Sequence, residues 1–126
     1  MLNDKDLELI GRAKDVISKN FDDIDGNHSV GCAVRSFDGE IYTGIDMKCL
    51  TSYTCASISA VSLAEANGVR EYDSIVCVKF DGENYEVVAP CGGCRQMLYR
   101  YAKNIEIIVN HSEKKRIEEL LVFPGE

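Results

Sequence analysis

The sequence predicts an α/β fold in which helices cover both faces of one mixed sheet. Apolar residues recur at helical spacing in some segments and form short β-branched runs in others, and the two kinds of segment are interspersed along the chain. The 126 residues contain only two prolines and no linker, repeat or low-complexity tract. We therefore expect a single domain over residues 1–126.

The first half of the chain predicts a helix followed by a hairpin. Residues 4–19 carry apolar side chains close to helical spacing, after a cap candidate at Asn3 or Asp4. The hairpin is predicted from strands at 29–37 and 40–46 around a tight turn at Asp38-Gly39.

The second half predicts alternating helices and strands. Helices are expected at 55–67, which ends before the C′ candidate Gly68, at 91–103, and as a short closing helix at 116–121. Strands are expected at 75–80, before a turn at Asp81-Gly82, and at 105–109. This order is that of a mixed sheet with helices on both faces.

The net charge and the apolar pattern of the chain limit the classes of partner and the locations to expect. The formal net charge of -7 disfavours polymeric nucleic acid and anionic membranes, which attract positive charge, although a single base in a pocket stays compatible with it. The start of the sequence does not resemble a secretory signal, and no apolar run approaches the roughly 18 residues of a membrane span. We therefore expect a cytosolic protein, in which six cysteines indicate metal binding or catalysis rather than disulfides.

Cys91 and Cys94 form a CxxC motif at the start of a predicted helix. The positive end of the helix dipole favours thiolate over thiol, and thiolate is the form that binds zinc. Taken alone, the motif has two meanings: half of a metal site, or a redox pair of the thioredoxin type.

Cys55 favours the metal site. It lies at a second predicted helix start, 36 residues before Cys91, so three thiolates leave the fourth tetrahedral position to water, as in a catalytic zinc centre. A structural zinc needs a fourth protein ligand, and the chain has no second CxxC or histidine pair. Cys32 and Cys77 lie in apolar strands and are interpreted as core residues.

Three motifs resemble those of the cytidine deaminase family. Residues 90–98, PCGGCRQML, resemble its second zinc motif, Cys55-Ala56 resembles the first, and residues 30–44 resemble its first hairpin. The 11-residue spacing from Gly44 to Cys55 is similar to that of the blasticidin-S deaminase branch, which has an aromatic tail where this chain has residues 122–126. The resemblance covers about residues 5–121 and implies a three-layer α-β-α fold with a mixed sheet of about five strands.

The resemblance implies zinc-dependent hydrolytic deamination of cytidine or a cytosine-type aminonucleoside such as blasticidin S. In the family a glutamate two residues after the first zinc ligand shuttles the protons. Ser57 occupies that position here, and a serine hydroxyl is too weak an acid to do so near pH 7. Glu65 is roughly 12 Å further along the same helix. Activity is therefore expected to be low or absent.

Three explanations of Ser57 stay open at this point: a natural non-catalytic or altered homologue, an engineered inactive variant, or a catalytic residue supplied by a neighbouring subunit. A thiol redox protein using Cys91 and Cys94 is a further alternative. Family members are commonly tetramers and some are dimers, so the resemblance implies a homotetramer or a dimer.

The resemblance also implies the contacts of a small-molecule nucleoside. His28 takes the place of a stacking aromatic residue, Asp46 that of a ribose-binding asparagine, and Lys48 that of a sugar-binding glutamate. The backbone at Ala56 and Cys91 is expected to face the base, and the carbonyl of Ala89 the leaving amine. Arg95 is expected to donate to the thiolates as an outer-sphere residue.

Overall fold

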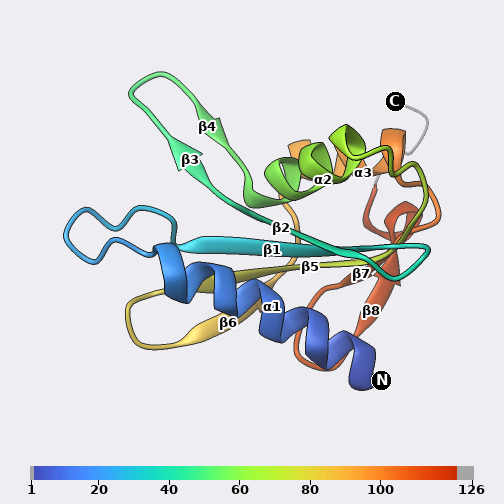
Figure 1. The fold of residues 1–126 in the computed structure, drawn as a ribbon, viewed down its shortest axis with the longest axis horizontal. Coiled ribbons are helices and arrows are strands. Elements are labelled where there is room, and N and C mark those ends of the chain that lie inside the picture. Colours follow the sequence, from blue (N-terminus) through green and yellow to red (C-terminus); the bar gives the residue numbers. More distant parts are fainter. Residues whose placement is uncertain (1, 122–126) are drawn as a thin grey trace.

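The computed structural model describes residues 2–121, which form three layers with a sheet in the middle (Figure 1). Residues 122–126, at the position of the aromatic tail of the blasticidin-S deaminase branch, lie outside the described residues. The helices are α1 (Asp4–Asn20), α2 (Ala56–Ala66), α3 (Gly92–Tyr101) and the 3₁₀ helix η1 (Ile117–Leu120). The strands are β1 (Val30–Ser36), β2 (Ile41–Ile45), β3 (Met47–Lys48), β4 (Tyr53–Thr54), β5 (Tyr72–Phe80), β6 (Tyr85–Val88), β7 (Glu106–Ile108) and β8 (Lys114–Arg116). The predicted α/β class and the three-layer arrangement are confirmed.

The central sheet is mixed, as predicted. Its strands follow the order β2-β1-β5-β7-β8, and β6 pairs with the second half of β5. Only β5 and β7 run parallel, and the connection between them contains α3. Strands β3 and β4 form a separate two-stranded hairpin that projects from the body of the molecule (Figure 1).

The alternation of side chains along the strands divides the core in two. On β5, Ile75 and Cys77 face α2 and α3, whereas Val76 and Val78 face α1. Helix α1 begins with a capping box, in which Asn3 accepts from the backbone of Asp6 and the Asp6 carboxylate accepts from the backbone of Asn3. The site-bearing helices α2 and α3 therefore share one face of the sheet.

Gly44 on β2 sets how closely α2 approaches the sheet. A Cβ atom at this position would lie 2.7 Å from the carbonyl oxygen of Ala56 and 2.8 Å from the Cβ atom of Ser59. Only a residue without a side chain permits this approach, and it places the start of α2, and with it Cys55, directly against the sheet.

Several short elements differ from the sequence prediction. Strand β5 starts three residues earlier than expected, and β6, β8 and the β3–β4 hairpin were not predicted. The segment 116–121 forms a 3₁₀ helix rather than a regular one. Within the charged run 113–116, Lys114 lies on β8 and pairs with the buried Asp6 at 3.1 Å.

Within residues 2–121, no helix has both the length and the apolar character that crossing a membrane requires.

Candidate metal centre

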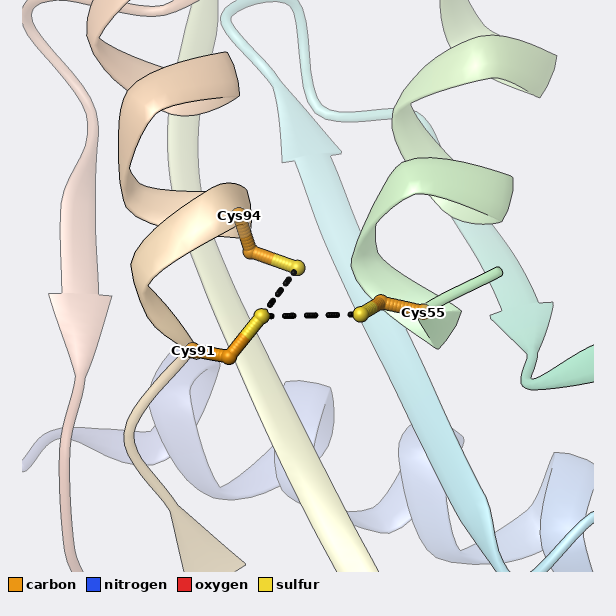
Figure 2. Close-up of side chains that lie close together, drawn as sticks. All are labelled: Cys55, Cys91 and Cys94. Atoms are coloured by element: carbon orange, nitrogen blue, oxygen red, sulfur yellow. Dashed lines mark hydrogen bonds between the residues drawn. The ribbon is translucent and has the colours of Figure 1, made fainter. Parts of the chain in front are cut away.

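Three cysteines meet where the first turns of α2 and α3 approach each other (Figure 2). Cys55 is the N-cap residue of α2 and Cys91 that of α3, both with extended backbone, and Cys94 lies in the first turn of α3. No side chain caps either helix. The free N–H groups and the positive ends of two helix dipoles therefore surround the sulfur atoms, which stabilises negative charge on them.

The distances between the sulfur atoms fit a single metal ion. The Sγ atom of Cys91 lies 3.5 Å from that of Cys55 and 3.3 Å from that of Cys94, and all three lie within 4.8 Å of one another. A tetrahedral ion with Zn–S bonds of about 2.3 Å separates its sulfur ligands by about 3.8 Å. Small side-chain movements are enough to reach this geometry, so the donor set fits zinc.

The electrostatics of the thiols also fit a cation. Burial raises the pKa values of Cys55 and Cys94. The pKa of Cys91 is lowered: burial opposes its ionisation, but hydrogen bonding with the backbone and the side chain of Cys94 favours the thiolate. Three thiolates this close repel one another, and a bound dication offsets that charge.

A cavity of about 330 Å³ opens beside the three sulfur atoms. It is lined by Val30, Tyr53, Cys55, Ala56, Ser57, Cys77, Val88, Ala89, Pro90, Cys91 and Cys94. Three protein ligands leave one tetrahedral position of a zinc ion for water or substrate. An open cavity beside such a centre is the arrangement of a catalytic rather than a structural zinc site.

Ser57 lies in this cavity wall, in the first turn of α2. The residue is 1% exposed, and its hydroxyl has no hydrogen-bond partner among the described residues. Burial raises the pKa of the Cys94 thiol, and the Ser57 side chain lowers it by a smaller amount. No carboxylate lines the described part of the cavity. Glu65 lies near the other end of α2, where it accepts from Tyr72 and pairs with Arg70.

The other predicted site residues lie at different distances from the cavity. Ala56 and Ala89 line it. Asp46 is buried and does not line the cavity. His28 has a φ of 61°, and its Nδ1 atom is hydrogen-bonded to the backbone carbonyl oxygen of Asp46 at 2.8 Å. Lys48 is exposed on β3 and is not a lining residue. Contact of His28, Asp46 or Lys48 with a ligand stays a prediction.

Arg95 binds the backbone on either side of the candidate metal centre. Its guanidinium donates to the carbonyl oxygens of Pro90 at 2.8 Å and Leu120 at 3.0 Å. The expected hydrogen bond to a thiolate is not among these contacts. Arg95 thereby ties the residue before Cys91 to the end of η1 and fixes the start of α3.

Several residues of the cavity wall were not predicted as site residues from the sequence. Cys77 is buried, as expected of a core residue, but it also lines the cavity, and Tyr53 enters from the unpredicted hairpin. The period-two alternation of β5 places Cys77 on the same face as Ile75, under α2 and α3. That alternation is the signal that points to Cys77, whereas no local pattern points to Tyr53.

Fold and site together define an α/β domain in which three thiols lie close enough to hold one metal ion. A family model described as the cytidine and deoxycytidylate deaminase zinc-binding region matches residues 3–111. The chain belongs to this family. It is 30% identical to a blasticidin-S deaminase of Bacillus cereus, over 95% of this chain and 91% of that protein. It is 31% identical to a cytidine deaminase of Sporosarcina psychrophila, over 76% and 72% of the two chains.

Solved structures agree with this assignment. The crystal structure of cytidine deaminase from Mycobacterium leprae superposes with a TM-score of 0.76 at 25% identity, covering 91% of this chain and 95% of that one. The cytidine deaminase from Bacillus anthracis superposes with a TM-score of 0.77 at 19% identity, over 94% and 86% of the two chains, a likeness in fold alone. The predicted family is confirmed.

Proposed function

We propose that this protein binds zinc through Cys55, Cys91 and Cys94 and binds cytidine or a cytosine-type aminonucleoside such as blasticidin S in the adjoining cavity. Its ancestral reaction is hydrolytic deamination, in which water replaces the amine on a ring carbon and ammonia leaves. Ser57 stands where the family glutamate acts, so turnover by this chain is low or absent.

One observation carries this proposal. Three thiols from two helix starts lie close together, and a cavity opens beside them in which no other described residue supplies a charged side chain. The family relationship supports the same reaction class, because the relatives at 30% and 31% identity are a blasticidin-S deaminase and a cytidine deaminase.

Different residues of the chain have different roles in the proposed reaction. A zinc ion held by the three cysteines would lower the pKa of a water molecule and supply the nucleophile near neutral pH. The apolar walls, including Val30 and Val88, remove bulk water from the ring of the ligand. Ala89 lines the cavity, and the family resemblance implies that its carbonyl accepts from the ring amine. Ser57 is too short and too weak an acid to carry protons from the nucleophile to the ring and the leaving group.

The direct test compares this chain with its Ser57→Glu variant. Both are assayed for zinc content and for deamination of cytidine and blasticidin S. We expect both to hold one zinc ion and the variant to be faster by about 10²- to 10⁴-fold, the usual contribution of general acid–base catalysis. Full activity of the unaltered chain, or no zinc in either protein, contradicts the proposal.

A second candidate function follows from Ser57 itself: a nucleoside-binding protein without turnover, either natural or engineered. It predicts heat of binding in calorimetry and no product. The thiol redox alternative has less support, because Cys55 joins Cys91 and Cys94 in one cluster. That alternative predicts a reversible Cys91–Cys94 disulfide and no tightly held metal.

We further propose a homotetramer, or a dimer, in the cytosol. The family relationship supports the assembly. The net charge of -7 argues against binding to polymeric nucleic acid or to membrane surfaces. Gel filtration that gives a monomer mass would contradict the assembly.

A further inference from the structure

Cys32 on β1 and Cys77 on β5 are two free thiols outside the candidate metal centre. They lie opposite each other in the antiparallel register of the two strands and belong to the core under α2 and α3. Their side chains interact with each other. In Figure 2 the two strands run behind the three thiols of the candidate metal centre.

The two cysteines occupy a position at which antiparallel strands bring side chains closest together. The N–H of Phe80 donates to the carbonyl oxygen of Ser29 at 2.8 Å, so this pair is hydrogen-bonded. Hydrogen-bonded and non-hydrogen-bonded pairs alternate along the strands, which makes Cys32–Cys77 a non-hydrogen-bonded pair. The Cα atoms of such pairs are about 4.5 Å apart, within the range of roughly 4.4–6.8 Å that a disulfide spans. A bond between the two sulfur atoms therefore needs little movement of the strands.

Only one of the two thiols is accessible from the cavity beside the metal centre. Cys77 is 8% exposed and lines this cavity of about 330 Å³. Cys32 is 0% exposed and does not line it. Since oxidation of a thiol depends on its exposure, a small oxidant in the cavity reaches Cys77 first, and Cys32 lies next to it as a resolving thiol.

We propose that Cys77 and Cys32 form an oxidation site, in which hydrogen peroxide that enters the cavity oxidises Cys77 and Cys32 then closes a cross-strand disulfide. The sulfur of Cys77 attacks one peroxide oxygen, the O–O bond breaks, and Cys77 becomes a sulfenic acid while water leaves. The sulfur of Cys32 then attacks the sulfur of Cys77, the S–O bond breaks, and a second water leaves. In total the two thiols lose two electrons and two protons, and one peroxide becomes two water molecules.

This disulfide changes the cavity wall without consuming a metal ligand. It draws the sulfur of Cys77 towards β1 and joins the two central strands under α2 and α3. Cys55, Cys91 and Cys94 take no part in either step, so bound zinc is expected to stay in place. A reversible, redox-sensing bond is also the usual form of a disulfide in a cytosolic protein.

Peptide mapping without reduction tests for the disulfide. Zinc-loaded protein is treated with hydrogen peroxide, its remaining thiols are blocked, and it is digested. We expect a peptide that links Cys32 to Cys77, lighter by two hydrogen atoms than the two free peptides and released by dithiothreitol. The exposed Cys49 is the internal control for the oxidant. The linked peptide is detected whether or not the protein turns over a nucleoside, so the test is independent of the proposed function.

Two matched variants test the order of the steps. Cys32→Ala removes the resolving thiol, so Cys77 is expected to accumulate as a sulfenic acid that dimedone labels. Cys77→Ala removes the accessible thiol, so Cys32 is expected to be at least about tenfold less oxidised than Cys77 is in the first variant, because it is fully buried.

Three results would overturn the oxidation site. The first is a Cys32–Cys77 pair that stays reduced while Cys49 is oxidised. The second is a set of cross-links confined to Cys55, Cys91 and Cys94. The third is equal oxidation of Cys32 in the Cys77→Ala protein and of Cys77 in the Cys32→Ala protein. If either variant does not fold, the peptide map of the unaltered chain decides by the first two results.

Discussion

At the scale of single residues, the six cysteines have three different environments. Cys55, Cys91 and Cys94 share the metal centre, Cys32 and Cys77 are buried opposite each other on β1 and β5, and Cys49 is exposed on the hairpin. A thiolate is needed both for metal binding and for nucleophilic reaction. The same residue type therefore gives a candidate metal ligand, a core side chain and an exposed thiol in one small domain.

Replacing Cys91 by serine tests the metal centre. The alcohol is a far weaker ligand than a thiolate, and even the loss of an outer-sphere partner lowers metal affinity 10- to 100-fold. We expect Cys91→Ser to lose zinc by at least about 100-fold in affinity, measured by competition with a chromogenic chelator. Cys49→Ser, at the exposed cysteine, is the matched control and is expected to retain zinc fully. Equal retention by both variants would contradict the assigned ligand set.

Cys49 itself is expected to be the first cysteine to react with iodoacetamide. Hydrogen bonds from Ser52, and next from the backbone of Thr51, lower its pKa to about 7. Since the thiolate is the reactive form, the alkylation rate rises as the pH passes through about 7 and then levels off. Peptide mass spectrometry at several pH values gives this midpoint.

The hydrogen-bond partner provides the control for Cys49. Ser52→Ala is expected to move the midpoint of alkylation towards the ordinary thiol value of about 8.5. A midpoint that is the same with and without the Ser52 hydroxyl would show that this bond does not stabilise the thiolate.

At the scale of elements, the position of α2 decides whether Cys55 reaches the other two thiols. Gly44→Ala would bring a methyl group within 2.7 Å of the Ala56 carbonyl, so α2 must move away from β2. Overpacking of this kind costs about 1–3 kcal/mol. We expect a lower Tm and, because the start of α2 shifts, weaker zinc retention, followed by differential scanning fluorimetry and metal analysis.

Gly11→Ala is the matched control for Gly44→Ala. It makes the same change inside α1 at an exposed position where a Cβ atom meets nothing within 4 Å. Alanine is favoured over glycine in a helix by about 1 kcal/mol, so this variant is expected to be slightly more stable. A loss of stability as large as that of Gly44→Ala would show that the tight approach of α2 is not the cause.

The elements that the sequence predicts are those with strong local signals. Helix α1 has a capping box and an apolar stripe, and the β1–β2 hairpin has a largely apolar first strand and a turn at Gly39. The strands of the β3–β4 hairpin are short and exposed, and β6 is short and partly buried. Pairing with a partner strand defines these elements more than their own residues do. Strand β8 consists of charged residues, and only its pairing with β7 and the bond from Lys114 to Asp6 reveal it.

Local signals also explain why the metal centre could be predicted from the sequence and its cavity could not. The metal centre is predictable because ligand chemistry and helix starts are local properties, as at Cys91 and Cys94. The cavity wall is not, because Tyr53 and Cys77 meet there only through the tertiary fold. Their roles follow from packing, for which a single sequence carries no direct signal.

At the scale of the whole molecule, the metal centre joins parts of the chain that are far apart. Cys55 and Cys91 are separated by 36 residues, and the first turns of α2 and α3 meet at their sulfur atoms. An ion that binds only the folded state stabilises it by about 2.7 kcal/mol when its concentration is 100 times its Kd. For a chain of 126 residues this corresponds to a rise in Tm of about 10 °C.

The pH dependence of this stabilisation has a definite sign. Without metal, burial raises the pKa values of Cys55 and Cys94, so the folded state favours their thiol forms. That contribution is present at low pH and is lost above about pH 8.5, where unfolded thiols ionise. With zinc the sign is reversed, because each ligand must lose its proton and binding strengthens as the pH rises. The difference in Tm between zinc-loaded and metal-free protein is therefore expected to widen from pH 6 to pH 9.

Thermal unfolding with and without added zinc, across this pH range, measures the difference directly. The metal-free reference is prepared with a chelator that is then removed by gel filtration. Cys91→Ser is the control, and it should show little zinc-dependent shift at any pH, since it lacks a ligand. A shift that stays constant from pH 6 to pH 9 would mean that protons and zinc do not compete for the same atoms, and the stabilising ion would then have to be held by groups other than Cys55, Cys91 and Cys94.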